Sequence, residues 1–131
     1  MKKIVLLAVV ACLYQVPAFA KDDCNNATSD AEINACYKSS KADAEKQLNL
    51  EYGNAKKRID AEYSASPADL QSYTTTLTDT QRGWLKYRDG QCSLESFMAE
   101  KGTITHDTLT DKCVARIDLE RVDQLKAIPY E

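Results

Sequence analysis

The sequence has few of the residues on which enzyme chemistry usually depends. It contains a single histidine, His106, and neither an HExxH-type motif nor a glycine-rich phosphate loop. A serine or cysteine nucleophile needs a base, which is normally histidine, and His106 lies in a polar stretch with no motif around it. The acidic residues are spread along charged segments and do not form a recognisable catalytic pair. These absences favour a binding protein over an enzyme, and the sequence predicts no cofactor.

Long apolar runs are missing after the first twenty residues, so the sequence predicts no membrane span. Two lysines near the start precede an apolar run at 4–13, and a small-x-small site follows at 18–20. This order is typical of a secretory signal peptide. We therefore expect cleavage after Ala20, export to the periplasm or beyond, and a mature domain formed by residues 21–131.

The leader has a second interpretation. Val9-Val10-Ala11-Cys12 also resembles a bacterial lipobox, which would make Cys12 a lipid-bearing N-terminus. Because Cys12 comes very early and a good conventional cleavage site follows it, we favour the soluble form over the lipid anchor.

Four cysteines remain once Cys12 is removed with the leader. None is spaced as C-x-x-C, which argues against a redox pair or a haem attachment site, and the single histidine argues against zinc. An even number in a small exported domain predicts two disulfides, with three possible pairings. We favour Cys24–Cys36 and Cys92–Cys113, because each pair brackets one local segment. Each bond would stabilise the fold by about 3 kcal/mol.

The charge balance is acidic. Loss of the two leader lysines takes the formal charge from −3 to −5. Binding to nucleic acid or to anionic lipid needs clustered lysine and arginine, so neither is expected as a partner. An acidic surface is better suited to a cationic protein.

Helical patterns dominate the mature chain. The Ser29–Glu32 stretch is a capping box, and an apolar stripe at three- and four-residue steps then predicts one long helix over about 30–64. The stripe consists of Ile33, Tyr37, Ala44, Leu48, Tyr52, Ala55, Ile59 and Tyr63.

Two more helices follow. Ser66-Pro67 is a helix-start pattern, and the apolar period then continues through Leu94 and Met98 to a predicted end at 101–102, with a possible kink at 74–76. We expect 103–107 to be a polar connection and a third helix to follow it until Pro129. Without strand patterns, the prediction is an all-α, elongated bundle of three antiparallel helices held by two disulfides.

The stretch 80–92 holds the only tryptophan of the chain. On a helix, Trp84, Arg88 and Cys92 share one face at four-residue steps. We interpret this face as a structural clasp near the third helix, in which Arg88 lies across the ring or reaches a carboxylate on a neighbouring helix. The alternative is a site that contacts a ligand.

Three groups of residues form a recognisable pattern. They are Gln81, Arg82, Trp84, Tyr87, Arg88, Asp89 and Cys92, then Leu48, Asn49 and Tyr52, and finally Cys113, Ile117, Arg121 and Leu125. In these three places the chain resembles the LprI-like lysozyme-inhibitor family, formerly a domain of unknown function. The early Cys24 and Cys36 also agree. The chain departs from the family pattern at the connection 101–104 and at Asp118, where threonine is usual.

The resemblance implies an exported, helical, disulfide-bonded domain that inhibits lysozyme-type muramidases. The expected partner is then a cationic lysozyme, met by an acidic helical surface. A protruding loop at 101–107 is the predicted cleft-occluding segment, with Lys101, Gly102, Thr103 and His106 as its partner-binding residues. The alternative is an envelope interaction or immunity-type module that binds another periplasmic protein without catalysis.

Overall fold

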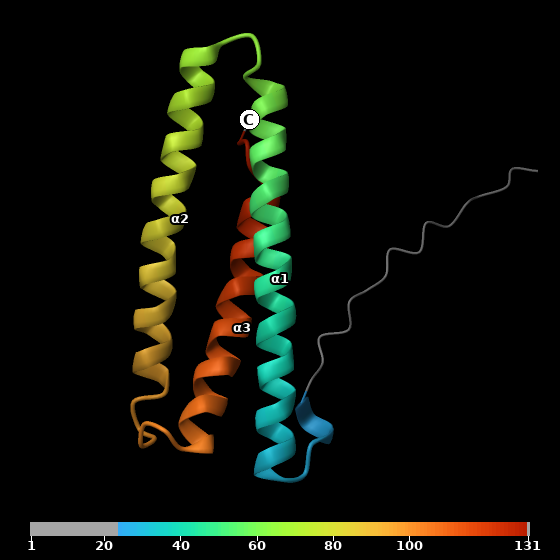
Figure 1. Ribbon diagram of the computed structural model, residues 1–131, viewed down its shortest axis with the longest axis vertical. Coiled ribbons are helices and arrows are strands. Elements are labelled where there is room, and N and C mark those ends of the chain that lie inside the picture. The colour runs from blue at the N-terminus through green and yellow to red at the C-terminus, as the bar shows by residue number, and fades with distance from the viewer. Residues whose placement is uncertain (1–23, 131) are drawn as a thin grey trace, which may run out of the picture.

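The structure is a computed structural model, and it describes residues 24–130. A short 3₁₀ turn, η1 (Cys24–Asn26), precedes three helices, α1 (Asp30–Glu62), α2 (Pro67–Glu95) and α3 (Ile104–Lys126). Figure 1 shows that α1 and α3 run in the same direction and that α2 runs opposite to both. The predicted signal peptide and Cys12 lie outside the described residues. Within residues 24–130, no helix is long and apolar enough to cross a bilayer.

The predicted start of α1 is confirmed by its capping hydrogen bonds. Ser29 Oγ accepts a hydrogen bond from the Glu32 backbone N–H at 3.3 Å, and Glu32 Oε2 accepts from the backbone N–H groups of Thr28 and Ser29 at 2.9 and 3.2 Å. These reciprocal bonds satisfy amides that have no partner inside the helix. The same hydrogen bonds, the one from the Thr28 amide foremost, lower the pKa of Glu32.

Helix α2 begins at Pro67 as predicted and continues without interruption through the threonines at 74–76. The predicted end at 101–102 is wrong, because α2 ends at Glu95. The predicted polar connection at 103–107 is also largely wrong. Thr103 Oγ1 accepts a hydrogen bond from the His106 backbone N–H at 3.2 Å, so Thr103 is the N-cap and α3 begins at Ile104.

The packing is most extensive between α1 and α3, the parallel pair, while α1 and α2 touch little. One core cluster joins all three helices, and it consists of Leu48, Ala55, Ile59, Leu77, Val122, Leu125 and Ile128. A second cluster joins α2 to α3, and it consists of Cys92, Cys113, Val114 and Ile117. Trp84 is partly buried and packs against both clusters. Burial of these apolar side chains is the main force that holds the bundle.

Both predicted disulfides are confirmed. Cys24 bonds Cys36 across a Cα–Cα distance of 5.9 Å, which fastens η1 to the first turns of α1. Cys92 bonds Cys113 across 5.4 Å, which fastens the last turn of α2 to α3. The second bond therefore fixes the end of the bundle at which the chain passes from α2 to α3.

The end of α3 is held by α1. Arg58 Nε and Nη2 donate hydrogen bonds of 2.8 Å to the backbone oxygens of Ile128 and Leu125. A cation at this position satisfies carbonyls that have no partner inside the helix and complements the negative end of the helix dipole. Arg58 also pairs with Glu51 at 2.9 Å, so its guanidinium links the Glu51 carboxylate to the two backbone carbonyls.

Candidate functional site

The face formed by Trp84, Arg88 and Cys92 points toward α3. Arg88 Nη1 donates to Asp118 Oδ1 at 3.1 Å, and Arg88 Nε donates to Asp89 Oδ1 at 2.9 Å. The guanidinium carbon lies 5.7 Å from the centre of the Trp84 ring. Arg88 thus contacts the ring and also pairs with a carboxylate on α3, the two contacts that the clasp interpretation expects.

Asp118 is completely buried, and its second oxygen, Oδ2, has no hydrogen-bond partner among the described residues. Burial raises the pKa of Asp118, and the hydrogen bond from Arg88 opposes that rise. Burial alone would lower the pKa of Arg88, but its bonds to Asp89 and Asp118 outweigh burial and raise it. Asp118, one of the two places at which the chain departs from the family pattern, is therefore one partner of a buried ion pair.

Arg121 contacts the same ring from α3, with its guanidinium carbon 5.7 Å from the ring centre. Its Nε donates to Gln81 Oε1 at 3.0 Å and its Nη1 donates to Gln124 Oε1 at 2.8 Å. Only 7% of Arg121 is exposed, and no carboxylate of the described chain pairs with it. Burial accordingly lowers its pKa.

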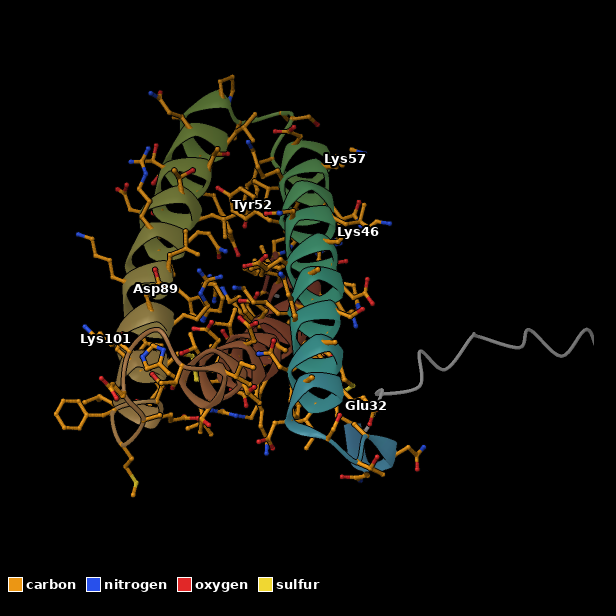
Figure 2. All side chains as sticks on the ribbon, turned by 60° about the horizontal axis from the view of Figure 1, so that its bottom comes forward. Glu32, Lys46, Tyr52, Lys57, Asp89 and Lys101 are labelled. Atoms are coloured by element: carbon orange, nitrogen blue, oxygen red, sulfur yellow. A yellow bond between two sulfur atoms is a disulfide. The ribbon has the colours of Figure 1, made fainter. Side chains whose placement is uncertain are left out.

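Six of the residues that carry the family resemblance line a groove of about 350 Å³ between α1 and α2, and they are Leu48, Asn49, Tyr52, Gln81, Arg82 and Arg88. Figure 2 shows Tyr52 directed from α1 toward α2, where its hydroxyl lies 3.3 Å from Thr78 Oγ1. Other residues of the pattern face solvent. Tyr87 is 60% exposed, and Arg82 makes only an exposed 3.5 Å pair with Asp79, which contributes little to stability.

The four residues predicted to contact a partner lie at the junction of α2 and α3, three of them in the connection and His106 in the first turn of α3. Lys101 and Gly102 are exposed there, and Gly102 has a φ of +85°, which favours glycine. Thr103 caps α3, and His106 is partly buried, with Nε2 3.4 Å from Ser96 Oγ. Figure 2 shows Lys101 at this end of the bundle. The Thr103 and His106 side chains therefore brace the turn, while Lys101 and the backbone of Gly102 are exposed to solvent.

The most exposed apolar side chains of this end were not predicted as a site. Phe97 is 84% exposed and Met98 is 96% exposed. Leu94, in the last turn of α2, is 70% exposed, and Ile104, the first residue of α3, is 52% exposed. We call these four residues the apolar tip. Leu94 and Met98, which continue the helical period in the sequence, are both exposed, and Met98 lies beyond the end of α2.

The sequence did contain a signal for this exposure. Residues two apart on a helix point in nearly opposite directions. Leu94 is two positions after Cys92, whose face meets α3, and so it turns away from the core.

The described residues contain no group of three or more histidine, cysteine, aspartate or glutamate side chains that could hold a metal ion. This end of the bundle places the apolar tip next to the hydrogen bonds of Ser96 and Thr103 and next to the Cys92–Cys113 disulfide.

Comparison with known proteins agrees with the fold and with the residue pattern. A family model described as lysozyme inhibitor LprI matches residues 21–125. An uncharacterized protein of Rhizobium meliloti (strain 1021) is 31% identical over 109 residues, which cover 81% of this chain and 78% of the relative. The crystal structure of a DUF1311 family protein from Pseudomonas putida KT2440 superimposes with a TM-score of 0.71 at 19% identity and covers 79% of this chain and 96% of that one. The chain therefore belongs to the LprI lysozyme-inhibitor family.

Proposed function

We propose that this protein is an exported inhibitor of lysozyme-type muramidases, that it binds its target through the apolar tip, and that it performs no catalysis itself. The observation that carries the proposal is the exposure of Phe97 and Met98 at one end of the bundle. Side chains of this size are costly to leave in water, and on soluble proteins exposed apolar patches mark contact surfaces. Family membership supports a lysozyme as the target.

The tip is supported by a rigid frame. The Cys92–Cys113 disulfide lies immediately before it, and the Ser96 hydroxyl donates a buried hydrogen bond of 2.9 Å to the Cys92 carbonyl. Thr103 Oγ1 accepts from the His106 N–H and also donates to the Glu100 carbonyl at 2.7 Å. A surface that is already ordered loses less conformational entropy on binding, so more of the contact energy becomes affinity.

The charges around the tip suit a cationic enzyme. Glu95, Glu100 and Asp107 flank the tip, where Lys101 is exposed and Arg116 pairs with Glu95 at 2.6 Å. The whole chain has a formal charge of −3. Opposite charge accelerates the encounter of the two proteins and is screened by salt. We therefore expect inhibition to weaken as ionic strength rises, chiefly through a slower association rate.

Lysis of bacterial cell walls, followed as the loss of turbidity, tests the proposal. The purified protein is added at up to about 50 μM to hen-type, goose-type and bacterial muramidases, a range that detects even weak complexes. We expect inhibition of at least one class. No inhibition of any class at that concentration contradicts the proposal, and recovery of a different periplasmic protein by affinity capture would then favour the interaction-module alternative.

A variant pair identifies the contact surface. Burial of one Phe or Met side chain contributes about 1.5–3 kcal/mol, so Phe97→Ser with Met98→Ser should raise the inhibition constant by about 100-fold or more. Both side chains are exposed, so the thermal melting temperature should stay unchanged. Leu50→Ser is the matched control, because Leu50 is an apolar residue of α1 that is 65% exposed. Equal inhibition by the tip variant and wild type would exclude the tip as the contact surface.

A further inference from the structure

A second cavity lies away from the tip, where the first half of α2 faces the end of α3 and the segment that follows it. Its volume is about 480 Å³, within the range of small-molecule sites. The lining includes the rings of Tyr63, Tyr73 and Tyr130, the hydroxyls of Thr76 and Thr80, and the side chain of Arg121. A cavity with aromatic walls and one cation has the composition of a site for a small anion that carries a ring.

The charge of Arg121 is not neutralised by the described chain. Its Nη2 is buried and has no hydrogen-bond acceptor, and its other donors reach only the amide oxygens of Gln81 and Gln124. The other inward arginine, Arg88, has the Asp118 and Asp89 carboxylates. Buried charges in proteins are normally paired, because an unpaired one loses its hydration without compensation. Arg121 therefore has the capacity for one further anionic partner.

The lining also limits the charge of that partner. Asp69 lies on the same cavity wall, and its carboxylate accepts a hydrogen bond of 2.6 Å from Ser66 Oγ. One arginine compensates one negative charge, and a second negative charge on the ligand would meet repulsion from Asp69. A monoanion is thus favoured over a phosphate dianion. The Tyr63 and Tyr73 rings, with centroids 5.3 Å apart, offer stacking surface to the body of the ligand.

We propose that this cavity binds a small organic monocarboxylate with an aromatic or apolar body, whose carboxylate pairs with the Arg121 guanidinium. The body of the ligand lies against the tyrosine rings, and the Thr80 hydroxyl donates to the second carboxylate oxygen. This site is independent of the tip and does not rest on the proposed inhibition of lysozyme.

Trp84 gives a direct readout of binding. It is the only tryptophan of the chain, and its ring centre lies 5.7 Å from the Arg121 guanidinium carbon. Phenylacetate, phenylacetamide and phenyl phosphate are titrated against the full protein, with fluorescence and calorimetry as the two measurements. We expect phenylacetate to bind at least about 10-fold more tightly than the amide, because a charge-assisted bond is lost in the amide. We expect phenyl phosphate to bind more weakly than phenylacetate.

Three variants complete the test. Arg121→Gln should weaken phenylacetate binding by about 10-fold or more, while Arg82→Gln, an exposed arginine of α2 outside the cavity, should leave it unchanged. Thr76→Tyr keeps Arg121 in place but fills the cavity, so it should also abolish binding if Arg121→Gln proves unstable. The proposal is overturned if the amide binds as tightly as phenylacetate, if Thr76→Tyr binds normally, or if wild type binds no phenylacetate at about 5 mM.

Discussion

Replacement of Arg88 by methionine should destabilise the protein far more than the same replacement of Arg121. Arg88 supplies the only hydrogen bond that the structure gives to the fully buried Asp118 carboxylate. Without it, Asp118 is a buried charge with no donor on either oxygen. Removal of one partner from a buried pair costs about 3–5 kcal/mol. Because the Arg88 side chain is 14% exposed, we expect about 3 kcal/mol, near the lower limit of that range.

The same reasoning gives the opposite result for Arg121. Its partners are the amide oxygens of Gln81 and Gln124, and Gln124 is exposed, so water can replace the lost bond there. Removal of a buried cation that has no anionic partner also relieves a desolvation cost. We therefore expect Arg121→Met to change the free energy of unfolding by less than about 1 kcal/mol, in either direction.

Urea unfolding followed by helical circular dichroism measures both variants. For a domain of this size, a loss of about 3 kcal/mol corresponds to a melting temperature lower by roughly 10–20 °C. The double variant Arg88→Met with Asp118→Leu is the control, because replacement of a whole buried pair by apolar residues is often neutral or stabilising. Equal losses for Arg88→Met and Arg121→Met, or no recovery in the double variant, would refute the reasoning.

Three further results are expected. Trp84→Ala should lower the free energy of unfolding by about 3 kcal/mol, because Trp84 packs against both core clusters, and urea unfolding measures it; an unchanged midpoint would contradict the clasp. The folded pKa of Asp118 is raised, so its contribution to the free energy of unfolding is fully present below its ordinary pKa of 3.8 and is lost as pH rises through the folded value. The free energy of unfolding of wild type, relative to that of Asp118→Asn, should therefore fall between acid and neutral pH. A rise over that range would contradict the raised pKa. Intact mass of the exported protein should correspond to a chain that begins at Lys21; a lipid-modified chain that begins at Cys12 would instead support the lipobox.

The apolar tip and Arg121 both hold groups in surroundings that are unfavourable for them. Phe97 and Met98 leave apolar surface in water, and Arg121 leaves a charge out of it. Each arrangement costs free energy in the isolated protein and is relieved by a suitable partner, an apolar cleft in one case and a carboxylate in the other. Most of the remaining core consists of aliphatic side chains, and the Arg88–Asp118 pair is a buried ion pair among them.

The sequence by itself determined the features that depend on neighbours a few residues away. The α1 start was predictable because Ser29 and Glu32 cap each other within one turn. The disulfide pairing was predictable because each bond closes a short segment, 12 residues in one case and 21 in the other. The inward stripe of α1 follows from helical periodicity, and the residue pattern by itself indicates the family.

Only the tertiary structure decided which surfaces are covered. Helix α2 ends at Glu95, next to the disulfide that ties Cys92 to α3 and the hydrogen bond from Ser96 to the Cys92 carbonyl, although the apolar period of the sequence continues to Met98. Asp118 is polar in the sequence but lies at a position that both neighbouring helices enclose, where Arg88 reaches it. Caps and periodicity are local properties of a chain, whereas burial depends on helices far apart in sequence. For that reason the helices could be predicted from the sequence, while the apolar tip and the unpaired charge of Arg121 could not.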